Sequence, residues 1–270
     1  MNNPAVVVGS DAIAEGAAPL LRELAATRRI GMLNTFAAKG LFAWNDPCHL
    51  GTIGLQARDL ELAGLHDADV LLVGVPDDEL SRQWLESAGA RWRDTPAGDL
   101  AAQLHGNEEP TPRPPLYDAL AGVCGPMYAS DSVPINPARA AADLAAWLPA
   151  GAAVLARRDE AGFWLGRTFP TRELGSVRFG TRRGQVPALV HVVSDTADTA
   201  DTADTADDDG AIVEVWSTRG AWLTPSERLE RLRAAIEGGR GAVLTVGIDG
   251  AALDSLVAVA GPLLWSPPAI

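Results

Sequence analysis

The sequence has few cysteines and a shortage of basic side chains. Only Cys48 and Cys124 occur among 270 residues, too few and too far apart for a disulfide framework or a zinc site. Their scarcity indicates a reducing, cytoplasmic setting. The formal net charge is −13 at pH 7. Because nucleic acids and anionic membranes bind cationic surfaces, neither is expected as a partner.

Long apolar runs and a targeting leader are also missing. No stretch reaches the roughly 18 apolar residues that a transmembrane helix needs, and the N-terminus has no basic, apolar-cored leader. We therefore expect neither export nor a membrane span. With 47% hydrophobic residues the chain can bury a substantial core, and its length suits one large or two modest domains.

The motifs of common catalytic sites are absent from the sequence. His49, His66, His105 and His191 are scattered, without a second histidine or an acidic residue at metal-ligand spacing. No serine lies in a Gly-x-Ser-x-Gly elbow, which removes the sequence argument for a hydrolase. We therefore predict no catalytic residue and no metal ligand.

Short apolar runs alternate with amphipathic stretches in the first part of the chain. Strands are predicted at residues 5–9, 30–33, 69–75 and 90–93, and a helix from residue 10 to about 27. Buried apolar runs that alternate with helices are typical of a parallel sheet covered by helices. The predicted fold class is α/β, with two parallel-sheet, Rossmann-like (doubly wound) layers.

A proline-rich segment separates the two predicted layers. Residues 105–115 include four prolines, which lack N–H donors and fix φ, so neither a helix nor a central strand can continue there. A helix at 136–148, with proline at its first position, and a strand at 152–156 are predicted beyond it. The predicted domains are therefore residues 1–106 and 107–270.

Lys39 is the one lysine of the chain, since every other strongly basic side chain is an arginine. A single lysine among arginines indicates a position that needs a compact ammonium on a flexible stem, although chance explains it equally well.

A helix that begins at residue 10 could bind a phosphate at its N-terminus, but an acidic residue at position 11 opposes this unless it caps the helix. Ligands of open α/β sheets bind at the carboxyl ends of the strands. The predicted small-molecule site consists of Gly9, Ser10, Thr35, Lys39, Gly51 and Gly74. The alternative is that these residues only shape tight turns.

Several short motifs follow one another in residues 6–75. A strand ends in a glycine, a Thr, Lys, Gly segment follows the second strand, then a Gly-x-x-Gly, then an Ala-Asp strand that ends in Gly. The residues of these motifs, in order, are Gly9, Thr35, Lys39, Gly40, Gly51, Gly54, Ala68, Asp69 and Gly74. In this order they resemble the central domain of thiamine-diphosphate-dependent enzymes of the acetolactate synthase and 2-oxoacid decarboxylase family. The resemblance implies an adenine-nucleotide site, because some relatives hold FAD or ADP in this domain.

The second half resembles the diphosphate-binding domain of the same family less closely, at residues 159–167 and 212–248. In the family, an aspartate of a Gly-Asp-Gly motif and an asparagine after the next strand hold the magnesium that clamps the cofactor's diphosphate. Here Arg219 stands at the aspartate position, and Ile248 or Asp249 at the asparagine position. No Gly-Asp-Gly occurs, so thiamine diphosphate and magnesium are not expected to bind. An unrelated α/β layer remains an alternative origin for this half.

The family's catalytic glutamate lies in an N-terminal pyrimidine-binding domain, whereas this chain begins at the central domain. We therefore expect a degenerate, non-catalytic relative that acts as a binding or assembly subunit, either as a homo-oligomer or with a partner subunit that carries a pyrimidine-binding domain. The alternative is a subunit of a decarboxylase-like or acetolactate-synthase-like enzyme whose active site another chain completes.

An Asp-Thr-Ala triplet is repeated four times from Asp195 to Ala206. Small and acidic residues bury little apolar area, so the sequence predicts a surface loop between two strands. A calcium-binding repeat is the alternative, but such repeats need glycines for their tight turns.

Overall fold

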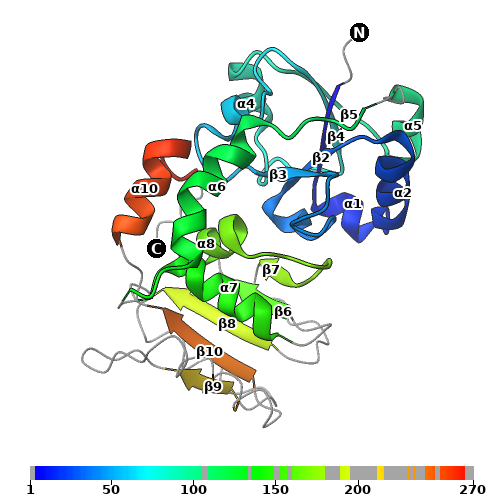
Figure 1. The fold of residues 1–270 in the computed structure, drawn as a ribbon. Coiled ribbons are helices and arrows are strands. Elements are labelled where there is room, and N and C mark those ends of the chain that lie inside the picture. The colour runs from blue at the N-terminus through cyan, green and yellow to red at the C-terminus, as the bar shows by residue number, and fades with distance from the viewer. Residues whose placement is uncertain are drawn as a thin grey trace. The chain divides into compact units, whose positions relative to one another are not determined.

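The computed structural model of the chain (Figure 1) contains two compact units. It describes residues 4–104, 109–132, 135–148, 153–156, 160–179, 189–194, 212–215, 241–246 and 250–264, with single positions at 230 and 234. Unit 1 comprises Met1–Gly122, Thr171–Leu174 and Val257–Leu264, and unit 2 comprises Val123–Pro170, Gly175–Leu256 and Trp265–Ile270. The Asp-Thr-Ala repeat, Arg219 and Ile248 lie outside the described residues.

Unit 1 is built on a five-stranded sheet in which every neighbouring pair is parallel. The strand order is β3-β2-β1-β4-β5. The strands are β1 (Ala5–Val8), β2 (Met32–Thr35), β3 (His49–Ile53), β4 (Asp69–Val73) and β5 (Arg91–Asp94). The chain moves outward from β1 through β2 to β3, then returns to the other side of β1 for β4. This reversal makes unit 1 a doubly wound layer, and the predicted fold class is confirmed.

Helices cover both faces of this sheet, as its apolar strands require. The helical elements are α1 (Ser10–Ala14), α2 (Ala18–Arg28), η1 (Phe36–Ala38), α3 (Asp59–Leu62), α4 (Arg82–Ser87), η2 (Ala97–Asp99), α5 (Leu100–Gln103) and α6 (Pro115–Tyr128). Val6 and Val8 pack in one core cluster with residues of α1, α2 and α5, whereas Val7 packs in the other with residues of α3, α4 and α6. Helices α1, α2 and α5 lie together on one side of the sheet in Figure 1.

The single helix predicted from residue 10 to about 27 is wrong, because the structure has two helices there. Helix α1 ends at Ala14, and Gly16 follows at a φ of 78°. Helix α2 begins at Ala18 with Pro19 in its first turn. The left-handed backbone at Gly16 cannot continue a helix, and a proline is tolerated only where no intrahelical N–H bond is needed.

The proline-rich segment belongs to unit 1. The backbone N–H of Thr111 donates to the carbonyl of Arg29 at 3.2 Å, and the N–H of Gly31 donates to the Thr111 hydroxyl at 3.0 Å. Unit 1 also takes in two later segments, through a bond from the Trp44 N–H to the Thr171 carbonyl and an isolated bridge between Gln56 and Leu263. Its extent therefore differs from the predicted residues 1–106, because backbone pairing across long sequence separations sets it.

Unit 2 contains a second parallel sheet, with the order β7-β6-β8-β10-β9. Its strands are β6 (Ala153–Ala156), β7 (Val177–Phe179), β8 (Leu189–Ser194), β9 (Ile212–Val215) and β10 (Gly241–Val246). The other helices are α7 (Pro137–Trp147), α8 (Glu160–Thr168) and α10 (Gly250–Ala260). Asn136 caps α7 by accepting from the Ala138 N–H at 3.0 Å, with Pro137 at the first helical position.

Among the described helices, none has the length and apolar character that crossing a bilayer would require.

Candidate functional site

The carboxyl ends of β1 and β4 meet at two glycines that have no room for a side chain. A Cβ on Gly9 would overlap the carbonyl oxygen of Gly74, and a Cβ on Gly74 would overlap the backbone N of Ala12. The Gly9 N–H donates to the Val73 carbonyl and the Asp11 N–H to the Gly74 carbonyl, each at 3.0 Å. The two glycines therefore let α1 begin directly against the end of β4.

Glu79 is the residue at which the predicted site converges. Its carboxylate is buried, and one oxygen, Oε2, accepts both the Ser10 backbone N–H at 3.2 Å and the Thr35 hydroxyl at 2.5 Å. Ser10 opens α1 and Thr35 ends β2, so the carboxylate joins two neighbouring strand ends. The Glu79 carboxylate thus already places a negative charge at the start of α1, where a phosphate would otherwise place one.

Glu79 is not among the site residues predicted from the sequence. A signal was present, because Asp77, Asp78 and Glu79 follow β4 at the point where the strand order reverses. What the sequence could not supply was the pairing, since Glu79 lies 44 positions from Thr35 and 69 from Ser10.

Gly51 does not lie at a strand end, contrary to prediction. It is the middle residue of β3, at a φ of 130°, and a Cβ there would lie 3.5 Å from Leu116 Cδ2. Gly54 is the glycine that follows β3, at a φ of 92°, and a Cβ on it would lie 2.5 Å from the Glu79 carbonyl oxygen. The second glycine of the Gly-x-x-Gly pair, rather than the first, therefore borders Glu79.

Lys39 follows η1 and is buried, with 7% of its surface exposed. Its charge acts on His49, at the start of β3. Burial is the main cause that lowers the pKa of His49 to about 4, and the cations of Lys39 and Arg113 lower it further against the opposing effect of Asp46. His49 is therefore neutral at pH 7, and its buried Nδ1 has no hydrogen-bond partner among the described residues.

Two cavities of unit 1 border segments that precede its strands, and neither is lined by the residues of the predicted site. One has a volume of about 1100 Å³ and is bounded by the residues that begin β1, β4 and β5 and by Ile30 and Gly31, which precede β2. The other, of about 790 Å³, lies beside the C-terminal half of α2 and the loop before β3. Gly31, Pro110 and Thr111 line both cavities, so the proline-rich segment forms a wall of each.

Residues 1–88 match the family described as "Thiamine pyrophosphate enzyme, central domain". The predicted resemblance to that domain is confirmed for this region, which includes the glycine and Thr-Lys-Gly motifs. A comparison with curated proteins gave no match.

The fold is similar to that of a solved structure, described as a candidate thiamin diphosphate-dependent enzyme isolated from Mycobacterium smegmatis. The match has a TM-score of 0.56 at 12% identity and covers 92% of this chain and 61% of that one. At this identity the likeness concerns the fold alone, and the chain spans about three fifths of the length of the protein it matches.

Proposed function

We propose that this chain is a non-catalytic relative of thiamine-diphosphate-dependent enzymes and serves as a binding or assembly subunit. The observation that carries the proposal is the pairing of β9 with β10. The two strands run parallel, with Val215 opposite Leu244, so the chain leaves both at the same edge of the sheet. Adjacent carboxyl ends of this kind are where the resemblance puts the two magnesium ligands.

The residues that follow these strands in the sequence do not suit a magnesium ion. Arg219 stands at the aspartate position of the family motif, and Ile248 or Asp249 stands at the asparagine position. Magnesium requires oxygen ligands, and a guanidinium at the first position repels a cation. At the second position Ile248 has no oxygen to offer, so Asp249 would be the single carboxylate of the pair. Without the metal, the diphosphate charge of the cofactor would have no clamp.

Isothermal titration calorimetry with thiamine diphosphate and magnesium tests this proposal on the full chain. We expect no binding by the natural sequence. An enzyme of the family with an intact Gly-Asp-Gly motif is the positive control, and a double variant, Arg219→Asp with Ile248→Asn, tests whether restored oxygen ligands restore a magnesium response. Magnesium-dependent binding of micromolar order by the unaltered chain would contradict the proposal.

The ligand that we propose for unit 1 is an adenine nucleotide, FAD or ADP, at the carboxyl edge of its sheet. Gly9, Gly74 and Gly54 allow close approach of backbone there, and Ser10 and Thr35 supply donors. A phosphate must compete with Glu79 for these donors, which predicts weak binding. Glu79→Gln keeps an oxygen acceptor and removes the charge, so we expect it to tighten nucleotide binding.

A thermal-shift titration with ADP and with FAD, read on the natural chain and on Glu79→Gln and Lys39→Ala, tests the nucleotide. Stabilisation that grows in Glu79→Gln and shrinks in Lys39→Ala supports the site. Glu86→Ala is the matched control, because Glu86 is an exposed acid on α4. If neither nucleotide stabilises any of these proteins, the nucleotide part of the proposal fails, while the missing magnesium clamp stands on its own test.

The assembly role is tested by sedimentation velocity of the purified chain, alone and mixed with a candidate partner that carries a pyrimidine-binding domain. We expect a homo-oligomer or a defined complex with the partner. A monomer that forms no complex would contradict assembly. Magnesium-dependent binding of thiamine diphosphate that appears only in the mixture would favour instead a shared active site.

A further inference from the structure

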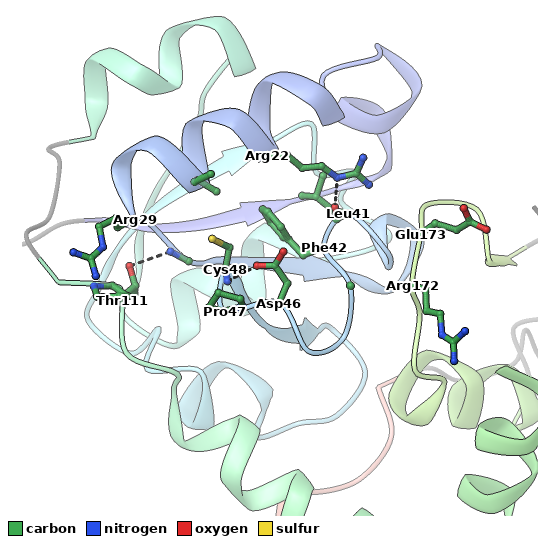
Figure 2. Close-up of a pocket in the computed structure, with 15 residues that line it drawn as sticks. Arg22, Arg29, Leu41, Phe42, Asp46, Pro47, Cys48, Thr111, Arg172 and Glu173 are labelled. Atoms are coloured by element: carbon green, nitrogen blue, oxygen red, sulfur yellow. Dashed lines mark hydrogen bonds between the residues drawn. The ribbon is translucent and has the colours of Figure 1, made fainter. Parts of the chain in front are cut away.

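The cavity beside α2, hereafter the α2 cavity, has the size and lining of a small-molecule site. Its volume of about 790 Å³ lies within the range of about 300–1000 Å³ that is usual for ligand sites. Every residue that lines it belongs to unit 1. Figure 2 shows Arg29 and Thr111 at one end, Arg172 at the other, and Phe42 and Cys48 between them.

The middle of the α2 cavity is apolar. Leu41 and Phe42 contribute side chains that are otherwise packed into the core of unit 1, with 0% and 5% of their surface exposed. Ala25 and Ala26 of α2 also line the cavity, and their side chains are only methyl groups. Because these alanines fill little space, the cavity keeps an open volume bordered by apolar atoms, which an apolar ligand could fill.

Among the charged residues that line the α2 cavity, arginines outnumber acids. Arg22, Arg29 and Arg172 line it together with two acids, in a chain whose net charge is −13. Arg22 donates from Nε to the Leu41 carbonyl at 2.6 Å and from Nη2 to the Gly40 carbonyl at 3.2 Å, and these neutral partners leave its charge in place. The Asp46 carboxylate, one of the two acids, accepts the Cys48 N–H at 2.7 Å.

Arg29 occupies a backbone position that would suit glycine better. Its φ of 56° and ψ of 40° are left-handed, and a side chain there costs on the order of 1 kcal/mol. Its carbonyl holds the Thr111 N–H, which fixes the proline-rich wall against the end of α2. The chain thus keeps an arginine at a strained position at the mouth of a cavity.

We propose that the α2 cavity binds a small amphipathic monocarboxylate, with its apolar body against Phe42 and Cys48 and its carboxylate against the guanidinium of Arg29. Arginine suits this role because its planar donors match the two oxygens of a carboxylate. Its lining includes none of the residues of the predicted carboxyl-edge site and not Glu79, so the site is distinct from the nucleotide site proposed there.

Displacement of anilinonaphthalene sulfonate by octanoate from the full chain measures binding, with octylamine, octanol and inorganic phosphate as comparison probes. We expect octanoate to displace the dye at lower concentration than the other three. Equal displacement by octylamine or octanol would overturn the role of the charge, and equal displacement by phosphate would overturn the role of the apolar body.

Alkylation of Cys48 locates the ligand. Cys48 lines the cavity and is partly exposed, whereas Cys124 is buried outside it and reports any general opening of the protein. Burial and Asp46 raise the pKa of the Cys48 thiol, so the reaction is run at about pH 8.5, where more thiolate is present. We expect octanoate to slow alkylation of Cys48 severalfold without changing Cys124. If saturating octanoate leaves the alkylation rate of Cys48 unchanged, the ligand does not bind in the α2 cavity.

Three variants separate binding from folding. Arg29→Gly removes the guanidinium and the backbone strain together, so we expect about tenfold weaker octanoate binding without loss of thermal stability. Ala26→Trp fills the cavity from the exposed side of α2 and should abolish binding. Arg28→Ala removes the same charge from a neighbouring exposed position outside the cavity lining and should leave binding unchanged. Unchanged binding in Arg29→Gly and Ala26→Trp, or equal loss in Arg28→Ala, would overturn the proposal.

Discussion

Removal of the Glu79 carboxylate should destabilise unit 1 more than a typical polar substitution does. Oε2 of Glu79 accepts from the Ser10 N–H and from the hydroxyl of Thr35, which is fully buried. Hydrogen bonds to a charged acceptor contribute about 1.5–3 kcal/mol each, and relief of the buried carboxylate offsets part of their loss. We therefore expect Glu79→Ala to lower the free energy of unfolding by about 2–4 kcal/mol.

Glu79→Gln should cost less, about 1 kcal/mol, because the amide oxygen can take the place of Oε2 while the charge is lost. Urea unfolding of the full chain gives the free energies. Hydrogen exchange of the peptides that contain Ser10 and Thr35 shows whether the change is local to the strand ends. Hydrogen exchange reports on unit 1 by itself, which matters because a chain with two units can unfold in more than one step.

Glu86→Ala, on the exposed side of α4, is the control and should change stability by less than about 0.5 kcal/mol. A Glu79→Ala protein as stable as this control, with unchanged exchange at Ser10 and Thr35, would refute the reasoning. The carboxylate would then have no structural role at the strand ends.

Three further predictions concern the same unit. Gly74→Ala should prevent stable folding, because its Cβ would overlap the backbone of Ala12, whereas Gly16→Ala, also at positive φ but with open space around it, should cost only about 1 kcal/mol by thermal melting. The pKa of His49 is lowered to about 4, so its contribution to stability is present above the unfolded value of 6.5 and is lost as pH falls towards 4. Between pH 6.5 and pH 4 the free energy of unfolding of the natural chain should therefore fall by roughly 3 kcal/mol more than that of His49→Gln. Parallel pH profiles of the two free energies would argue against this. Thr111→Val removes the acceptor of the Gly31 N–H and should speed amide exchange at Gly31 with a loss of about 1–2 kcal/mol; unchanged exchange would show that the proline-rich wall is held by other contacts.

Local sequence patterns determined much of the fold. Continuous apolar runs such as Val6–Val8 predict buried parallel strands, because both faces of such a sheet are covered. Gly9 and Gly74 were predicted as site residues, with tight turns as the alternative, and Asn136 with Pro137 as a helix start, since these residue types act through their own backbone or their nearest neighbours. The break between α1 and α2 was also readable, from Gly16 and Pro19, but the apolar periodicity on both sides obscured it.

The site depended on contacts that only the folded chain brings together. Glu79 meets Ser10 and Thr35 because the strand order reverses at β1, and no local pattern encodes that crossing. The α2 cavity is formed by α2, the loop before β3, the proline-rich segment and residues 172–173, which lie far apart in the sequence. The sequence by itself determined which segments become strands, turns and helices, because short-range sterics and apolar periodicity govern those choices. Tertiary structure alone decided which side chains face one another, because that depends on strand order and on packing between distant segments.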